Sequence, residues 1–557
     1  MSKLHITLIA ALLAIACGKG GGQPETAAPA VPSGVKLHGA TETTLTFQWN
    51  EVQGASYEWK LTSVESDTRT GTVSQRNVTI DKLTPGTAYS FSVQAVNGVG
   101  KSGWSAPLEV ATAGSKPVPG TFCVDAPLVV EVGSGATLGT SGLIQVFRAD
   151  GTQVDKIDMA DMAKVKVLED GTMVPAQKYA GGMHTFMDKL HSGDATRTVH
   201  YTPVRLKDGK LYIKLHSDVL EFGESYYLTV DESVAGNAVE KDDMPFTTKL
   251  PYFTKIAPPS TSLQVKPDGS GDFCTVQGAL SFASTLGKET EVTIEVGEGT
   301  FNELLFLQGK DNVTLRGESR EKTVIAYPNS ELYMEGSDNR CLFLATDCNN
   351  LVLENLTIAN TFYAQDHKGQ AETLYYNAHT ASFRLTVDSC ALISWQDTFL
   401  CKGEVYVYNS LIAGHCDYIW GYPKACLFED CEILSRAKGY IVQARVEDAS
   451  NKGFVFLHCT LTAANDVADG SVYLARSGGD SSVYDNVTYI NCSMSGAIAP
   501  AGWYTSPAPT PSAPTATSGW KEYGTWGVST ASRNAYGRML TASEAEAYSS
   551  KAAVLGW

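Results

Sequence analysis

Basic residues are scarce in this chain of 557 amino acids. Lysine and arginine together number 43, against 60 aspartates and glutamates, which gives a formal net charge of −17 at pH 7. A surface of this sign repels nucleic-acid phosphates and anionic lipid headgroups. We therefore expect no nucleic acid among the partners of this protein and no membrane binding through side-chain charge.

The twelve cysteines include no CxxC pair, the spacing that many zinc sites and dithiol redox motifs use. Their spacing therefore argues against a zinc site of this kind. Without Cys17, which lies in an N-terminal signal, an odd number of cysteines remains. An odd number argues against a disulfide framework, although Cys341 and Cys348 are near enough in the sequence to pair. We expect most of the others to be small core residues.

Long hydrophobic runs are absent except at the N-terminus. Residues 1–17, MSKLHITLIAALLAIAC, contain a short apolar run that ends in small residues before Cys17. This pattern predicts a lipoprotein signal peptide with a lipid on Cys17, and an ordinary cleaved signal is the alternative. Residues 18–32, rich in glycine and proline, are predicted to form a flexible tether. No later stretch approaches 18 uninterrupted apolar residues, so membrane contact is expected only through the lipid.

Export follows from this signal. We expect an outer-membrane lipoprotein of a Gram-negative-type bacterium, on the periplasmic or the cell-surface face, or else a secreted protein. We also expect a monomer.

Two β-patterned segments come next. Residues 33–114 alternate polar and apolar positions with period two. Within them, LTPGTAYSFSVQAVNGVGKSGWS (83–105) resembles a fibronectin type III domain, which implies a sandwich with Trp49 in its core. Residues 119–250 are again β-patterned, and LEFGESYYLTVDE (220–232) resembles a bacterial immunoglobulin-like domain. We predict two N-terminal β-sandwich domains, followed by a proline-containing linker at 249–261.

Short β-runs recur through residues 260–557. Several contain a small or apolar residue directly after a polar one, namely Leu356, Cys390, Ser410, Cys431, Cys459 and Cys492. The successive gaps are 34, 20, 21, 28 and 33 residues. A unit near 20 residues with variable insertions is typical of a parallel β-helix, in which stacked coils align equivalent residues in ladders. We predict an all-β chain whose last domain is a right-handed parallel β-helix, with an amphipathic helix at 276–286 covering its open end.

The segment SWQDTFLCKGEVYVYNSLIAGHCDYIWG (394–421) holds two aspartates, Asp397 and Asp417, 20 positions apart. One short coil separates them, so we expect one above the other at the strand spacing of about 4.8 Å. Two carboxylates at this distance do not ionise independently, and one pKa should rise while the other falls. Such a pair suits combined acid–base and nucleophilic chemistry. A purely structural ladder of polar residues is the alternative that spacing alone leaves open.

Neutral donors and a cation are expected near this pair. Gln396 precedes Asp397, and Gln370 lies 26 positions before Gln396, about one longer coil away. Side-chain amides of this kind stabilise a developing oxyanion. Arg476, in YLAR, is a candidate to hold one aspartate in its ionised form.

Residues 263–557 resemble the pectin methylesterases, a family of parallel β-helix enzymes. The resemblance rests on motifs in the family's order, which are KPDGSGDFCTVQGAL (266–280), GTFNE (299–303), GQAETL (369–374), WQDTFL (395–400), HCDYIWG (415–421) and YLAR (473–476). It implies a carboxylic ester hydrolase that removes methyl esters from pectin, a methylated homogalacturonan. Methanol would leave through an aspartyl acyl-enzyme, without metal or cofactor.

The resemblance also implies residue roles. Asp417 is the nucleophile, Asp397 is the acid and then the base, Gln396 and Gln370 stabilise the oxyanion, and Arg476 keeps Asp417 charged. Four aromatic residues are expected to contact the sugar chain, namely Trp395, Trp420, Tyr418 and Trp503. Gln443 and Arg445 resemble a family segment that we expect to shape the cleft wall.

Two positions depart from the family pattern. Ser477-Gly478 replaces a Pro-Trp pair after the arginine, which removes one aromatic surface from the cleft. Glu372 introduces a carboxylate two residues beyond Gln370, on the same face of the strand. Two other functions stay open: a pectate lyase, although its acidic calcium ligands are not evident in the sequence, and a non-catalytic, lipid-anchored protein that binds pectin or another glycan.

Overall fold

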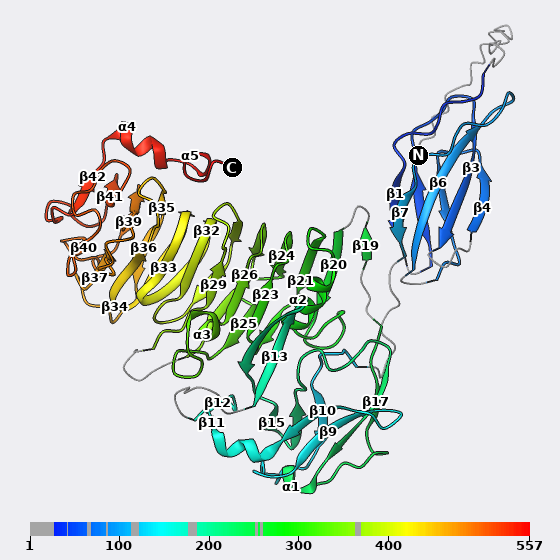
Figure 1. Ribbon diagram of the computed structural model, residues 1–557, viewed down its shortest axis with the longest axis horizontal. Coiled ribbons are helices and arrows are strands. Elements are labelled where there is room, and N and C mark those ends of the chain that lie inside the picture. Colours follow the sequence, from blue (N-terminus) through cyan, green and yellow to red (C-terminus); the bar gives the residue numbers. More distant parts are fainter. Residues whose placement is uncertain are drawn as a thin grey trace, which may run out of the picture. The chain divides into compact units, whose positions relative to one another are not determined.

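The computed structural model describes residues 27–41, 43–63, 68–84, 87–112, 122–176, 186–250, 254–256, 260–362 and 369–557 (Figure 1). The predicted signal peptide and Cys17 lie outside these ranges. Contacts divide the chain into two compact units, Met1–Leu83 with Thr87–Val110, and Thr84–Gly86 with Ala111–Trp557. Each unit is described by itself.

The first unit is a two-sheet β-sandwich with antiparallel pairing. One sheet contains β1 (Lys36–Ala40), β2 (Leu45–Gln48) and β5 (Asn77–Ile80), and the other contains β4 (Thr68–Val73), β3 (Ser56–Ser63), β6 (Ala88–Val96) and β7 (Leu108–Ala111). Alternate side chains fill the space between the sheets, where Phe47 stacks on Phe91 at 3.7 Å. Trp49 is buried in this core, as the sequence predicts.

The second unit begins with an antiparallel β-domain, residues 122–250, which we call the middle domain. One sheet contains β10 (Gln153–Asp158), β9 (Leu143–Arg148), β17 (Ser225–Val230) and β18 (Pro245–Thr247), and another contains β15 (Val204–Lys207), β16 (Lys210–Ile213) and β8 (Leu128–Glu131). Two hairpins pair β11 (Val165–Val167) with β12 (Met173–Pro175), and β13 (Met187–Ser192) with β14 (Ala195–His200). Two short helices are η1 (Met159–Lys164) and α1 (Glu232–Ala235). The immunoglobulin-like class of this domain stays a prediction.

The rest of the second unit is a parallel β-helix, and the predicted fold class is confirmed. Three series of strands stack in parallel register from coil to coil. The first series contains β20 (Ser260–Val265), β21 (Glu291–Val296), β24 (Val313–Gly317), β27 (Leu351–Glu354), β30 (Arg384–Asp388), β35 (Gly453–Leu457), β38 (Val487–Ile490), β41 (Trp520–Tyr523) and β42 (Gly537–Met539), with β19 (Thr254–Ile256) antiparallel to β20.

The second series contains β22 (Gly299–Phe301), β25 (Thr323–Tyr327), β28 (Thr357–Asn360), β31 (Ala391–Ile393), β36 (Thr460–Ala463) and β39 (Ser493–Met494). The third contains β23 (Leu305–Gln308), β26 (Phe343–Thr346), β29 (Leu374–Asn377), β37 (Val472–Arg476) and β40 (Trp503–Tyr504). Three long strands bend from one series into another, namely β32 (Phe399–Tyr408), β33 (Leu411–Glu429) and β34 (Glu432–Ala444).

The ladder predicted from the sequence lies at one corner of each coil. All six of its residues, from Leu356 to Cys492, are buried. Each follows a residue with positive φ, namely Asn355, Ser389, Asn409, Asp430, His458 and Asn491. Asn and Asp tolerate the left-handed conformation best, which explains the polar residue before each ladder position. All eleven cysteines in the described parts of the chain are free thiols, including Cys341 and Cys348.

Helices cover parts of the β-helix. The amphipathic helix α2 (Val276–Thr285) buries Ala279, Leu280 and Ala283 at the first coils. A single turn, α3 (Ser337–Arg340), lies before β26, and α4 (Ala542–Ala545), η2 (Glu546–Tyr548) and α5 (Lys551–Leu555) follow the last strand. None of the helices among the described residues is long and apolar enough to cross a membrane.

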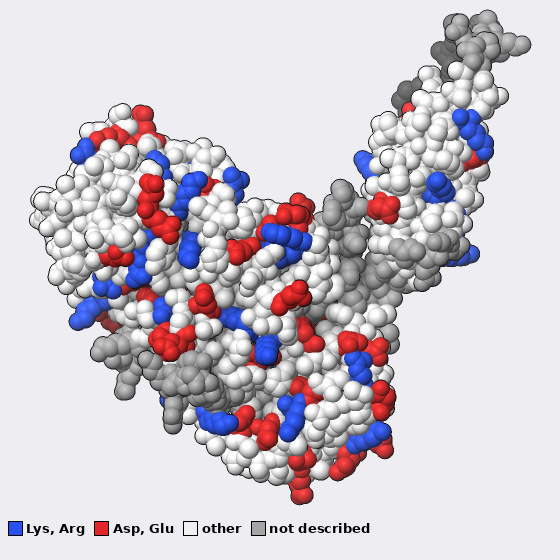
Figure 2. All heavy atoms as spheres, in the orientation of Figure 1, with Lys and Arg blue, Asp and Glu red and all other residues white. Residues whose placement is uncertain are grey.

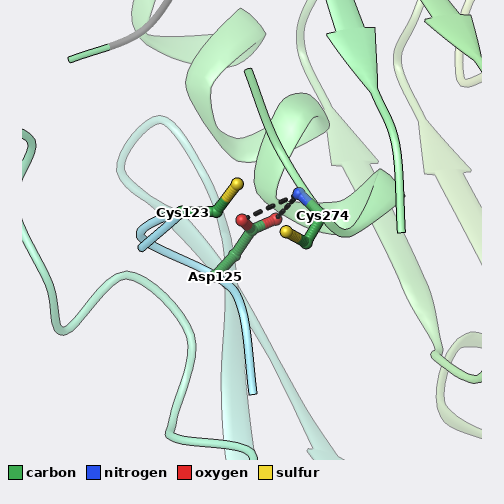
Figure 3. Close-up of side chains that lie close together, drawn as sticks. All are labelled: Cys123, Asp125 and Cys274. Carbon is green, nitrogen blue, oxygen red and sulfur yellow. Dashed lines mark hydrogen bonds between the residues drawn. The ribbon is translucent and has the colours of Figure 1, made fainter. Parts of the chain in front are cut away.

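The middle domain contacts the start of α2, where Thr275 is the N-cap residue and accepts from the Gly278 amide. Both carboxylate oxygens of Asp125 accept hydrogen bonds from the Cys274 amide, and one of them also accepts from the Thr275 amide and hydroxyl. Cys123 lies beside them (Figure 3), so three potential metal-ligand atoms fall within 4.8 Å of one another. Because the Asp125 carboxylate already accepts hydrogen bonds from Cys274 and from the N-cap residue Thr275, we assign this cluster a structural role in joining the middle domain to the β-helix.

Candidate active site

Coil stacking brings the two predicted aspartates together. Isolated parallel bridges align Gln370 with Gln396 and Gln396 with Cys416, so the residues that follow, Asp397 and Asp417, are equivalent positions of adjacent coils. Both have positive φ, 66° and 48°, and both side chains are almost fully buried. The predicted juxtaposition is therefore present.

Cationic and amide groups surround Asp417, which lies within β33. The guanidinium of Arg476, at the end of β37, donates through Nε to Asp417 Oδ1 at 2.8 Å and through Nη2 to Oδ2. Gln443 Nε2, from β34, donates to Oδ2 at 3.0 Å. Arg445 in turn donates to Gln443 Oε1, which fixes the orientation of the amide. These charge-assisted hydrogen bonds fix the Asp417 carboxylate in one orientation.

A different set of groups surrounds Asp397. Gln370 Nε2 donates to Asp397 Oδ2 at 3.0 Å, and Arg340 Nη2 reaches the same oxygen at 3.3 Å. Arg340 also donates to Gln370 Oε1 at 2.8 Å and pairs with the Glu372 and Glu331 carboxylates. Because one guanidinium contacts both Asp397 and Gln370, it sets the orientation of each toward the other.

The surroundings of Asp397 favour its protonated form. Burial, together with the negative charges of Glu372 and Asp417, raises the pKa of Asp397 well above its usual range, against the opposing effect of Arg340. The hydrogen bond to Asp417 raises the pKa of the Arg476 guanidinium, so that this partner stays charged. A carboxyl group with a raised pKa suits a general acid, and the arginine-bound Asp417 beside it is the candidate nucleophile.

The predicted donors lie beside this pair. Gln370 and Gln396 are half-buried neighbours in one ladder, directly before β29 and β32. Gly421, which ends the HCDYIWG motif, has a φ of 131°, and a Cβ there would lie 2.3 Å from the Cys401 carbonyl oxygen. Only glycine therefore fits at this point of the coil.

Two of the four predicted sugar-contacting aromatic residues lie in the core instead. Tyr418 is fully buried and its hydroxyl bonds to Ser435 at 3.0 Å. The left-handed backbone at Asp417 turns the next side chain inward. Trp503 is 1% exposed and stacks on Trp520 at 5.3 Å. The prediction that Tyr418 and Trp503 contact the sugar chain is therefore wrong.

Each of the other two predicted aromatic residues has an arginine guanidinium over its ring. The Arg436 guanidinium lies 4.0 Å from the centre of the half-buried Trp395 ring. Arg445 lies 4.9 Å from the ring of Trp420, which is 7% exposed. Their contact with substrate stays a prediction.

Sequence reasoning missed a tyrosine cluster and an arginine. Tyr440, Tyr473 and Tyr504 are half-buried and mutually packed, with Tyr440 and Tyr504 at 4.8 Å, and the Arg476 guanidinium lies 5.0 Å from the Tyr440 ring. Arg340 lies on a single helical turn without periodicity, so no pattern pointed to it. The only available signal was Glu372, a buried carboxylate that needs a cation.

The fold and the paired carboxylates together define a β-helix protein whose site suits hydrolysis by two aspartates. A family model described as Pectinesterase matches residues 262–556, more than half of the chain, and the chain belongs to this family. A Fibronectin type III domain model matches residues 30–111.

Relatives of known sequence carry the same family name. Pectinesterase 31 of Arabidopsis thaliana is 28% identical over 254 residues, which cover 43% of this chain and 76% of the relative. Probable pectinesterase A of Aspergillus flavus is 30% identical over 237 residues, 40% of this chain and 70% of the relative. Among solved structures, pectin methylesterase from Aspergillus niger is 27% identical with a TM-score of 0.44, and covers 53% of this chain and 93% of its own.

Proposed function

We propose that this member of the pectinesterase family hydrolyses methyl esters of pectin, with Asp417 as the nucleophile and Asp397 as the acid and base. As a pectinesterase it is a carboxylic ester hydrolase. The observation that supports these roles most strongly is the contrast between the two stacked carboxylates. Asp417 is held by Arg476 and Gln443, whereas Asp397 is buried beside Glu372.

In the first half of the reaction, an Asp417 oxygen attacks the C6 carbonyl carbon of a methylated galacturonate. The oxyanion that forms accepts hydrogen bonds from the amides of Gln370 and Gln396. When the intermediate collapses, the bond between C6 and the methoxyl oxygen breaks and Asp397 gives its proton to that oxygen. Methanol leaves, and C6 remains bound to Asp417 as an acyl-enzyme.

In the second half, water attacks the acyl carbon while the Asp397 carboxylate accepts a proton from it. The bond between C6 and the Asp417 oxygen then breaks, which releases the carboxylic acid of the sugar, and this acid loses its proton to the solvent. Asp397 is protonated again and Asp417 is ionised, so the enzyme returns to its starting state.

The sugar chain is expected to lie over the site and its aromatic neighbours. Trp395 and Trp420 remain the proposed sugar contacts. We add the exposed edges of Tyr440 and Tyr504, which adjoin Arg476 and offer an aromatic surface where the Pro-Trp pair is missing. Acidic and basic side chains are interspersed over the face shown in Figure 2. We also propose that the protein acts on this polysaccharide as a monomer.

Methanol release from highly methylated pectin tests the function. An esterase releases methanol and leaves the chain length unchanged. Unsaturated uronides in place of methanol would indicate a lyase, and chain binding with neither product would indicate a glycan-binding protein.

The Glu372 carboxylate offers a test by pH. Because the Glu372 charge raises the pKa of Asp397, the Asp397 carboxyl of a Glu372→Gln variant should lose its proton at a lower pH than in the wild type. We expect the alkaline limb of the kcat/KM profile to move to lower pH. Glu331→Gln is the matched control, since Glu331 pairs with the same Arg340 but is not among the main causes of the Asp397 shift. An equal displacement in both variants would contradict a specific role for Glu372.

We also propose that residues 1–17 direct export and that Cys17 carries a lipid. The rest of the chain would then lie outside the inner membrane, as a tether (18–32), two β-domains (33–114 and 119–250) and the β-helix (260–557). In a Gram-negative host, Cys17→Ser should abolish labelling by palmitate and move the protein from the membrane fraction to the soluble fraction. Soluble, unlabelled wild-type protein would instead indicate an ordinary cleaved signal.

A further inference from the structure

The middle domain inserts one arginine into the β-helix. Arg197, on β14, is 4% exposed. Its Nη1 donates to the carbonyl oxygens of Leu305 at 2.7 Å and Leu342 at 3.2 Å, and its Nη2 donates to that of Asn339 at 3.0 Å and to that of Cys341. Burying a guanidinium is costly unless hydrogen bonds compensate for the lost water, and here backbone carbonyls of another domain accept from both terminal nitrogens, Nη1 and Nη2.

A second side chain of β14 supports the same segment. His200 Nε2 bonds to Asn329 Oδ1 at 3.2 Å, and Asn329 Nδ2 donates to the carbonyls of Asn339 at 2.8 Å and Cys341 at 3.1 Å. Burial lowers the pKa of His200 to about 4, so this contact is made by the neutral ring. The middle domain therefore holds the backbone on both sides of residue 340.

Residue 340 is the arginine of the active site. Arg340 ends α3, and its side chain reaches Gln370, Glu372 and Asp397. The two carbonyls that accept from both Arg197 and Asn329 belong to Asn339 and Cys341, directly before and after it. A continuous set of hydrogen bonds thus runs from β14 through the turn at 339–341 to the carboxyl group of Asp397.

We propose that Arg197 is a positioning residue for ester hydrolysis, and that the middle domain is a working part of the active site through the path Arg197–Arg340–Asp397. This inference rests on the proposed function. It assigns residues 122–250 a role beyond that of a spacer, because their loss would release the arginine that aligns the oxyanion donor Gln370 with the acid Asp397.

The test measures methanol release by Arg197→Met in the full-length protein. We expect kcat to fall about ten- to a hundredfold while KM stays within about twofold, because small misplacements of reacting groups are costly and the sugar-binding surface is untouched. Arg340 lowers the pKa of Asp397, whereas Glu372 and Asp417 raise it. Two further charged groups face this set, Glu331 through its pair with Arg340 and Arg476 through its pair with Asp417. Displaced Arg340 should therefore move the alkaline limb of kcat/KM to higher pH.

Arg205→Met is the matched control. Arg205 is a half-buried arginine of the same domain, but it bonds to the Asp170 carbonyl and to Thr172 Oγ1, both within the middle domain. Its replacement should leave kcat and the pH profile unchanged. Arg197→Lys keeps the charge with fewer donors, and we expect an intermediate kcat with the same direction of pH shift. If Arg197→Met does not fold, the same measurements on Arg197→Lys test the proposal.

A double-mutant cycle separates positioning from general stabilisation. If Arg197 acts through Arg340, the variant with both Arg197→Met and Arg340→Lys should be no slower than Arg340→Lys alone. If the double variant instead lost kcat by the product of the two single losses, the proposal would be overturned. It would also be overturned if Arg197→Met had a lower unfolding temperature but the kcat and pH profile of the wild type.

Hydrogen exchange supplies a readout that does not need activity. Amides of residues 337–342 should exchange faster in Arg197→Met than in wild type or Arg205→Met. Unchanged exchange there would overturn the proposal by itself. A wild-type protein that releases no methanol would instead refute the proposed function, and the exchange result would still decide whether Arg197 holds the turn.

Discussion

An Asp417→Asn variant should release methanol from pectin at least about 10³-fold more slowly than the wild type, because an amide is a poor nucleophile and cannot form the acyl-enzyme. Binding of oligogalacturonides should survive, since the proposed sugar contacts lie on other residues. Asp417 has a φ of 48°, and asparagine also tolerates this left-handed conformation, so the fold should persist. Methanol assays and binding isotherms measure the two effects separately.

Asp430→Asn is a chemically identical control. Asp430 also has positive φ, at 54°, and lies exposed on the same β-helix. Its replacement should change the rate by no more than about twofold. Residual turnover of Asp417→Asn near the wild-type rate would remove Asp417 from the proposed role, and equal losses in both variants would point to damaged folding.

An Asp397→Asn variant should lose roughly 10²- to 10³-fold in steady-state rate, the usual contribution of a general acid and base. The loss should depend on the leaving group. Methanol needs protonation, whereas the more acidic trifluoroethanol leaves without help, so trifluoroethyl esters of oligogalacturonate should acylate Asp417 in the variant.

Deacylation still needs a base, and this separates the two roles of Asp397. With the trifluoroethyl ester we expect a burst of alcohol close to one equivalent of enzyme, followed by slow turnover. The alkaline limb of the kcat/KM profile should also disappear. A variant that shows no burst and loses equal activity on both esters would contradict the assignment of Asp397 as acid and base.

The coil repeat could be predicted from the sequence because stacking imposes a spacing on the residues. The ladder from Leu356 to Cys492 recurs with gaps near 20 or 30 residues, and a polar residue with positive φ precedes each member. The same spacing placed Asp397 one coil from Asp417. Where a repeat governs position, the sequence is thus sufficient to bring distant side chains together.

The environment of each aspartate could not be predicted in this way. Arg340 lies 57 positions before Asp397 on a single helical turn between β25 and β26, outside the strand repeat, so its distance in the sequence does not predict the contact. Tyr418 is expected from the sequence to contact the sugar chain, but the left-handed residue before it directs its side chain into the core. Such local reversals break the alternation that sequence reasoning uses.

The hydrogen bonds from Cys274 and Thr275, at the start of α2, to Asp125 of the middle domain limit how this chain can be shortened. Leu190 and Val199 of the middle domain also share one apolar core with Ala279 and Leu280 of α2. A recombinant fragment that starts at the family match near residue 262 would leave this surface bare and prone to aggregate. The smallest soluble catalytic fragment should therefore begin before residue 122 and retain everything from there to the C-terminus.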